Sequence, residues 1–218
     1  MKPDADHPGR PDEAAGREHP ADGDAGEDPD ALETRLRTAW IGEPPRLGGP
    51  IPLVEYDPAW PGLFDREAVR IRAALGPRAL QVEHVGSTAV PGLAAKPIID
   101  VLLVVADPAD ERSYVPALEA AGYDLRIREP DWHEHRMLKG PDTDVNVHVH
   151  GPTSPEIGRM LAFRDRLRAR PEERARYEAA KRTLAAREWR YVQEYADAKS
   201  AVVEAILAGA SAEPEARR

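Results

Sequence analysis

The stretch that decides the fold is VEHVGSTAVPGLAAKPIIDV, at residues 82–101. It holds a Gly-Ser pair, Gly86 and Ser87, ahead of an apolar segment that Asp100 interrupts. Glycine permits positive φ and close approach, so such a turn can present N–H groups and a hydroxyl to a phosphate. A carboxylate on the neighbouring strand can hold Mg²⁺ against the same phosphate, because Mg²⁺ prefers oxygen ligands. The stretch therefore predicts a phosphate-binding loop beside a metal-binding strand.

This stretch resembles the signature of the GrpB family, which reads close to EH-h-GST-x-VPGL-x-AKP-h-ID-h, where h is apolar. VEYDPAWP at residues 54–61 and LAFRDRLR at residues 161–168 extend the resemblance, which covers about residues 51–208. The family is regarded as a branch of the nucleotidyltransferase fold. The resemblance thus implies an α/β (α+β) domain with a mixed β-sheet, flanking helices and a helical C-terminal segment. It also implies a transferase that moves a nucleotidyl or phosphoryl group, with a small phosphorylated ligand or nucleotide as partner and Mg²⁺ or Mn²⁺ as cofactor.

The chain departs from the superfamily at Asp100-Val101-Leu102, where a metal-binding nucleotidyltransferase usually has Asp-h-Asp or Asp-h-Glu. Residues two apart on a strand share a face, so Leu102 takes the position of the second metal ligand. This argues against a two-metal mechanism. The alternative function is a non-catalytic nucleotide- or cofactor-binding module. Related domains are fused to dephospho-coenzyme A kinase, which implies a link to coenzyme A metabolism.

Asp100 and Ser87 are the predicted catalytic residues, and Asp100 is the predicted metal ligand. A carboxylate inside an apolar strand is costly to bury unless it is paired or coordinated, so a structural ion pair is the alternative. The predicted substrate-binding residues are Gly86, Ser87, Lys96, Asn146, His148, Glu83, His84, Arg164 and Lys181.

A second cluster follows from alternation in DVNVHVH, at residues 144–150. On a strand, Asp144, Asn146, His148 and His150 fall on one face and the three valines on the other. The polar row is expected to face the same cleft as Ser87 and Asp100, and a solvated strand face is the alternative.

Other predicted site residues have equally plain alternatives. Glu83 and His84 point to opposite faces of a strand, so at most one enters the cleft, and either can instead be a core hydrogen-bonding residue. Lys96 is a phosphate ligand or a surface lysine. Arg164 and Lys181 lie on expected helices, where basic residues either reach an anionic ligand or are solvated. His133 and His135 are expected in a loop or at a strand edge.

The chain divides into three parts. Residues 1–48 are expected to form a disordered acidic tail and linker, with a short helix at residues 29–40; residues 49–210 form the domain and residues 211–218 a flexible C-terminus. Strands are expected at residues 51–56, 79–85, 97–105, 123–128, 135–139 and 144–150. Helices are expected at residues 57–75 and 107–121 and from Ser154 onward.

Composition narrows the function further. The chain lacks cysteine, which excludes disulfides and thiolate metal sites. In residues 1–33, three basic residues oppose eleven carboxylates, so most of the formal charge of −9 belongs to this segment and the domain is nearly neutral. Nucleic-acid binding is therefore not expected. Arginine outnumbers lysine 25 to 5, which makes each lysine informative. No apolar run is long enough to span a membrane and the N-terminus lacks a secretory signal, so a cytoplasmic location is expected.

Overall fold

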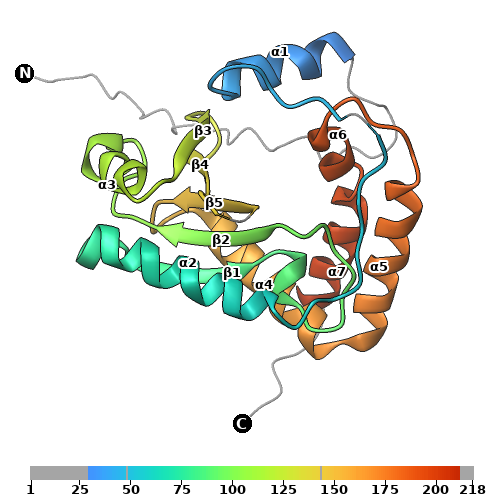
Figure 1. Ribbon diagram of the computed structural model, residues 1–218. Helices are drawn as coiled ribbons and strands as arrows, with labels where there is room; N and C mark the ends of the chain where they lie inside the picture. Colours follow the sequence, from blue (N-terminus) through green and yellow to red (C-terminus); the bar gives the residue numbers. More distant parts are fainter. Residues whose placement is uncertain (1–28, 48, 143, 212–218) are drawn as a thin grey trace, which may run out of the picture.

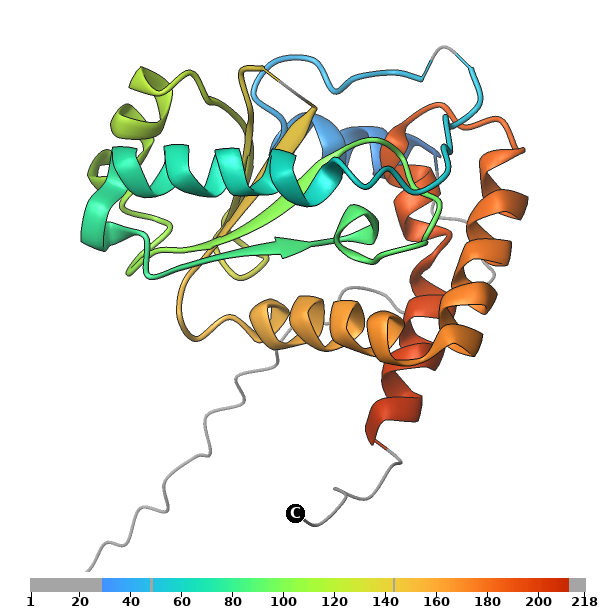
Figure 2. The ribbon, with the colours of Figure 1, turned by 60° about the horizontal axis from the view of Figure 1, so that its bottom comes forward.

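A five-stranded mixed sheet forms the centre of the protein, and helices pack on both of its faces (Figure 1). The computed structural model describes residues 29–47, 49–142 and 144–211. The α-helices are α1 (Pro29–Ala39), α2 (Trp60–Leu75), α3 (Val115–Ala120), α4 (Pro155–Ala169), α5 (Pro171–Ala185), α6 (Val192–Asp197) and α7 (Ser200–Ser211). Figure 2 shows α2 on one side of the sheet and α4 on the other. α5, α6 and α7 stand together beside one end of the sheet. The predicted α/β class, mixed sheet and helical C-terminal segment are confirmed.

The sheet has the strand order β1-β2-β5-β4-β3. Its strands are β1 (Gln81–Val85), β2 (Ile99–Val104), β3 (Asp124–Glu129), β4 (His135–Lys139) and β5 (Val145–His150). β2 and β5 are parallel, and the other neighbours are antiparallel. The strand predicted at residues 51–56 is wrong: within this segment only Val54 pairs, in an isolated bridge with Ala95. Pro52 has no N–H to donate to a ladder, which is one reason why the segment does not join the sheet.

Alternation along β2 and β5 separates an apolar face from a partly polar one. The residues of these strands in the main core are Ile99, Val101, Leu103, Val145, Val147 and Val149. They pack with α2 and α3. The parallel register places Asp100 opposite Asn146 and Leu102 opposite His148. Residues opposite one another in neighbouring strands share a face, so Asp100, Asn146 and His148 all project from the face away from α2.

The helix boundaries follow local signals. α2 ends before Gly76, and Ser154 caps α4, with its side chain accepting a hydrogen bond from the N–H of Glu156. The helix predicted at residues 107–121 is much shorter, because α3 begins only at Val115. Pro116 lies in its first turn, where the missing N–H costs no helical hydrogen bond.

α1 packs onto the domain instead of standing apart from it. Leu32 and Leu36 are 4% and 5% exposed and form a small cluster with Tyr191. Trp40, just after the helix, pairs with Ile127 of β3. The short helix expected at residues 29–40 is therefore present and forms part of the folded unit. A disordered tail and linker is predicted at residues 1–48 and a flexible C-terminus at residues 211–218; of these, residues 1–28, 48 and 212–218 lie outside the described residues.

Candidate functional site

The Gly-Ser turn stands directly against Asp100. Gly86 connects β1 to a 3₁₀ turn at Ser87–Ala89. The backbone of Gly86 has φ 71° and ψ −171°, a region that essentially only glycine occupies. Val85, the residue before it, pairs with Asp100 of β2. A Cβ atom on Gly86 would lie 2.4 Å from Asp100 Oδ2. Glycine is required here both for the backbone conformation and for the close approach.

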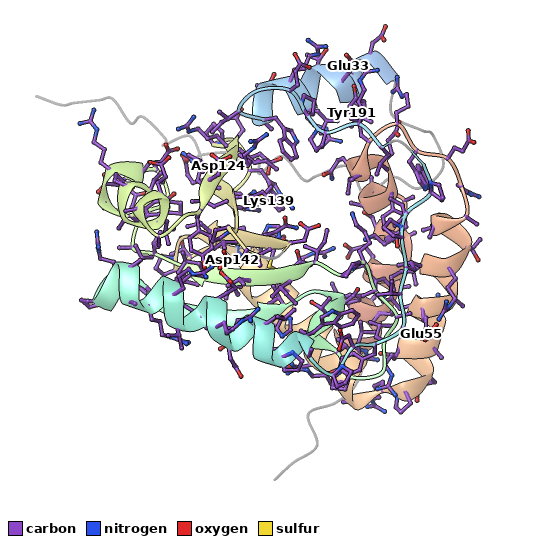
Figure 3. All side chains as sticks on the ribbon, in the orientation of Figure 1. Glu33, Glu55, Asp124, Lys139, Asp142 and Tyr191 are labelled. Atoms are coloured by element: carbon purple, nitrogen blue, oxygen red, sulfur yellow. The ribbon has the colours of Figure 1, made fainter. Side chains whose placement is uncertain are left out.

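Ser87 and Asp100 line a cavity of about 580 Å³, which lies between the sheet, the C-terminal helices and α1. Figure 3 labels Lys139 on the sheet side of this space and Tyr191 on the helical side. The polar residues that line it are Ser87, Thr88, Lys96, Asp100, Lys139, Asp144, Asn146, His148, Lys181, Tyr191, Gln193, Tyr195 and Lys199. Its apolar wall includes Leu36, Trp40, Leu47, Ile127 and Met137. One cavity thus combines charged and apolar side chains in its lining.

Four of the chain's five lysines line this cavity: Lys96, Lys139, Lys181 and Lys199. The fifth, Lys2, lies outside the described residues. No arginine of the described residues lines the cavity, although the chain has five arginines for every lysine. The carboxylates on its wall are Asp100 and Asp144, so positive charge is in excess. The cavity is suited to an anionic ligand.

Lys181 and Lys199 reach the cavity from the helical side. Lys181 is 2% exposed, and its Nζ lies 3.2 Å from Ser87 Oγ and donates to the Ala94 carbonyl. Burial, helped by the charge of Lys199, lowers the pKa of Lys181 to about 7. Burial likewise lowers the pKa of Lys199 to about 8, and its Nζ lies over the ring of Tyr195. A bound anion would favour the charged form of both side chains.

Asp100 is held by its neighbours on the sheet. Asn146 Nδ2 donates to Asp100 Oδ1 at 2.9 Å, and His148 Nε2 lies 3.6 Å from the same oxygen. Burial raises the pKa of Asp100, but contacts with His148 and Asn146 outweigh it, so the pKa lies below its ordinary value. The carboxylate is therefore ionised at neutral pH. The predicted row on β5 does face the same cavity as Ser87 and Asp100 through Asp144, Asn146 and His148.

A line of hydrogen-bonding groups continues behind His148. Its Nδ1 lies 3.1 Å from His135 Nε2, and His135 Nδ1 lies 2.7 Å from Glu129 Oε2. Burial lowers the pKa of His135. This arrangement was not predicted from the sequence, because the pairing of β4 with β5 that brings the two rings together is not visible in either segment alone. Lys199 was not predicted as a site residue either, although the scarcity of lysine was a usable signal.

Gly86 and four other residues of the predicted site, Glu83, His84, Arg164 and His150, are not among the residues that line the cavity. Arg164 pairs with Glu83 at 3.0 Å and donates to the His84 carbonyl. The His84 ring stacks on Phe64, its Nε2 lies 3.1 Å from Thr88 Oγ1, and burial lowers its pKa to about 4. His150 is fully buried and stacks on His135. These side chains have structural contacts, and their predicted roles in binding stay predictions.

The donors available to a metal near Asp100 are few. The described residues contain no group of three or more His, Cys, Asp or Glu side chains arranged around a common point. Leu102, at the position of the usual second acid, is fully buried. Asp100 and His148 are the two titratable side chains that come together here, with Asn146 beside them. Such a set fits an ion that keeps water or ligand oxygens for its remaining positions.

The Gly-Ser turn, the aspartate on the neighbouring strand and the helical segment that closes the cavity define a nucleotidyltransferase-like α/β domain. Within that class, the profile of the family described as GrpB protein matches residues 50–209. The chain belongs to the GrpB family. No helix in the part of the chain that the structure describes has the length and apolar character needed to cross a membrane.

Several relatives are similar over most of the chain. A UPF0157 protein of Halalkalibacterium halodurans is 61% identical over 180 residues, which cover 83% of this chain and 92% of the relative. The crystal structure of the conserved protein GrpB from Enterococcus faecalis superposes with a TM-score of 0.61 at 30% identity and covers 73% of this chain and 99% of that one. A dephospho-CoA kinase of Mycolicibacterium paratuberculosis is 36% identical over 160 residues, which cover 62% of this chain but only 39% of the kinase.

Proposed function

We propose that this protein binds a small phosphorylated ligand, such as a nucleotide, in the cavity between the sheet and the C-terminal helices. The observation that carries the proposal is the convergence of Lys96, Lys139, Lys181 and Lys199 on one cavity. Burying several ammonium groups together is unfavourable unless an anion accompanies them. The pKa values of Lys181 and Lys199 are lowered, which is the expected state of such a site without its anion.

The apolar part of the cavity lining suggests the rest of the ligand. Trp40, Ile127 and Met137 line the same cavity as the four lysines. A ligand that joins a phosphate to a flat or apolar group would contact both kinds of side chain. Nucleotides and coenzyme A precursors have this character.

The reaction that fits a GrpB domain is metal-assisted transfer of a nucleotidyl or phosphoryl group. Ser87 and the backbone around Gly86 would contact the phosphate, Asp100 would hold Mg²⁺ or Mn²⁺, and the lysines would offset the developing charge. When bound, the cation would supply charge neutralisation at the phosphate.

One observation favours the second candidate, a binding module without catalysis. The usual second acid is Leu102, a fully buried side chain that cannot ligate a metal. The dephospho-CoA kinase of Mycolicibacterium paratuberculosis contains a matching segment that forms 39% of its length. A module that binds a coenzyme A precursor or nucleotide would suit such a fusion. The sequence itself holds no G-x-x-x-x-G-K-[ST] phosphate loop.

The test is a thermal-shift screen of nucleotides and coenzyme A precursors, with and without Mg²⁺ or Mn²⁺. A ligand at a hundred times its Kd stabilises the native state by about 2.7 kcal/mol, which raises Tm by roughly 5 to 10 °C in a domain of this size. Lys96→Met and Lys199→Met should abolish the shift. Arg187→Met, an exposed basic residue outside the cavity, is the charge-matched control and should preserve it.

Two results would overturn the proposal: no phosphorylated compound raises the Tm of the wild type, or Arg187→Met reduces the shift as much as the lysine variants do. Product formation from the ligand that binds then separates the transferase from the binding module.

A further inference from the structure

Leu102, which takes the position of the usual second acid, has the imidazole of His148 beside it. In the parallel register of β2 and β5, Asp100 lies opposite Asn146 and Leu102 lies opposite His148. Leu102 packs with Ile157 under α4, so its side chain belongs to the apolar core. The superfamily usually has a second carboxylate ligand at the position of Leu102 on β2. In this protein the neighbouring strand β5 instead places the imidazole nitrogen of His148 beside that position.

The distance between the two side chains is the distance expected between two ligands of the same metal ion. His148 Nε2 and Asp100 Oδ1 are 3.6 Å apart. This is longer than an N–H···O hydrogen bond, which spans about 2.7 to 3.2 Å. Two ligands that each lie about 2.0 to 2.2 Å from one ion are roughly 3 to 3.6 Å apart at bond angles of 90 to 120°. Both side chains are partly exposed, 24% for His148 and 29% for Asp100, and both line the cavity.

His148 is also oriented as metal-binding histidines are. A histidine that binds a metal through Nε2 carries its proton on Nδ1 and usually donates it to a neighbour that fixes the ring. Here that neighbour is His135 Nε2 at 3.1 Å, and His135 Nδ1 can donate to Glu129 at 2.7 Å. With both protons on Nδ1, each histidine donates one hydrogen bond in this row, and the lone pair of His148 Nε2 is left facing Asp100. Asn146 also holds the carboxylate, by donating from Nδ2 to the same oxygen, Asp100 Oδ1.

We propose that Asp100 and His148 form a divalent-cation site in which His148 Nε2 takes the place of the second carboxylate, and that the site prefers Mn²⁺ or Co²⁺ to Mg²⁺. Mg²⁺ is bound through oxygen, whereas Mn²⁺ and Co²⁺ bind imidazole more readily. Glu129 and His135 are positioning residues that act through His148. The inference deepens the proposed function and rests on its cavity, but it concerns the metal alone.

The first test uses the full chain and MnCl₂, CoCl₂ or MgCl₂ alone, without any phosphorylated compound. Failure of this proposal and failure of phosphate binding are therefore distinguishable. Titration calorimetry should give one site per chain, with a Kd for Mn²⁺ at least about tenfold below that for Mg²⁺. Electron spin-echo measurements on the Mn²⁺ complex should show coupling to imidazole ¹⁴N. Equal affinity for the two ions, or a Mn²⁺ complex without ¹⁴N coupling, would overturn the proposal.

The second test locates the nitrogen. His148→Gln should abolish both the ¹⁴N coupling and the preference for Mn²⁺, and His148→Asn is the substitute if the first variant fails to fold. His133→Gln, an exposed histidine outside the cavity, is the matched control and should change neither. Glu129→Gln should weaken Mn²⁺ binding by about 10- to 100-fold and keep the ¹⁴N coupling, as expected of a positioning residue. Loss of the coupling in His133→Gln, or its survival in the folded His148 variants, would refute the site.

Discussion

Lys181 Nζ lies 3.2 Å from Ser87 Oγ, although 94 positions separate the two residues in the chain. The contact joins α5 to the turn after β1 and places an ammonium group at the predicted phosphate loop. Because Lys181 is buried and its pKa is lowered to about 7, its charge changes with pH near neutrality.

The first prediction concerns stability without ligand. Between pH 7 and the ordinary lysine value of 10.5, Lys181 is protonated in the unfolded chain but neutral in the folded one. The unfolded state then binds more protons, so this group makes the free energy of unfolding rise with pH, by at most about 1.4 kcal/mol per unit. Urea unfolding at pH 7 and pH 9 should show a larger gain for the wild type than for Lys181→Met. Equal gains would contradict the lowered pKa.

Anion binding should depend on pH in the opposite direction. The lysines attract a phosphate only when they are protonated, and the pKa values of Lys181 and Lys199 are about 7 and about 8. Raising the pH from 7 to 9 should therefore weaken binding of the ligand found in the screen, by about tenfold per charge lost. Calorimetric titration at the two pH values checks this. An affinity that does not change would mean that these lysines do not contact the ligand.

Gly86→Ala should be strongly destabilising. The substitution forces a Cβ atom into a glycine-only backbone region and to within 2.4 Å of Asp100 Oδ2. Gly92 also has positive φ, at 75°, but nothing lies within 4 Å of its added Cβ atom. Gly92→Ala should therefore cost about 1 to 2 kcal/mol from backbone strain alone, and Gly86→Ala at least about 1 kcal/mol more. The midpoint of urea unfolding measures the stability of both variants. If the two variants lose similar stability, the contact of the added Cβ atom with Asp100 does not affect stability.

Asp100→Asn should separate binding from stability. The variant keeps an acceptor for Asn146 but loses the charge, so the free energy of unfolding should fall by only about 1 to 2 kcal/mol. Mn²⁺ binding should be lost. Asp144→Asn is the control, since Asp144 lies on the same cavity wall, is 55% exposed and pairs with Lys139. It should change stability by less than about 1 kcal/mol and leave Mn²⁺ binding intact. A loss of several kcal/mol in Asp100→Asn with metal binding retained would make Asp100 a structural residue.

Removal of α1 should both destabilise the domain and open the cavity. Leu36 and Trp40 line the cavity, and Leu32 and Leu36 are buried against Tyr191. A chain of residues 48–218 should lose roughly 3 kcal/mol or more relative to residues 29–218, because burial of each leucine contributes about 1.5 to 3 kcal/mol. Residues 29–218 should match the full chain, since residues 1–28 contain no leucine, isoleucine, valine, phenylalanine, tyrosine or tryptophan. Urea unfolding of the three chains tests the prediction. Equal stability of the two truncated chains would show that the packing of α1 contributes nothing.

Sequence alone determined the local parts of this molecule. The Gly-Ser pair and the apolar run around Asp100 predicted a turn followed by a central strand, and both are present as Gly86 to Ala89 and β2. Alternation in residues 144–150 correctly separated the valines in the core from Asn146 and His148. These features depend on backbone geometry within a few residues, where a period of two decides which face a side chain takes.

Only the tertiary structure decided which of these side chains meet. His135 reaches His148 because β4 pairs antiparallel with β5 in one register. Lys181 reaches the turn after β1 from α5, and Lys199, directly before α7, lines the same cavity. Glu83 and His84, adjacent to the same turn in sequence, are instead held in an ion pair and in the core. The physical reason is that register and helix packing arise from burial of apolar surface across the whole chain. No local pattern specifies how that burial is shared among distant elements.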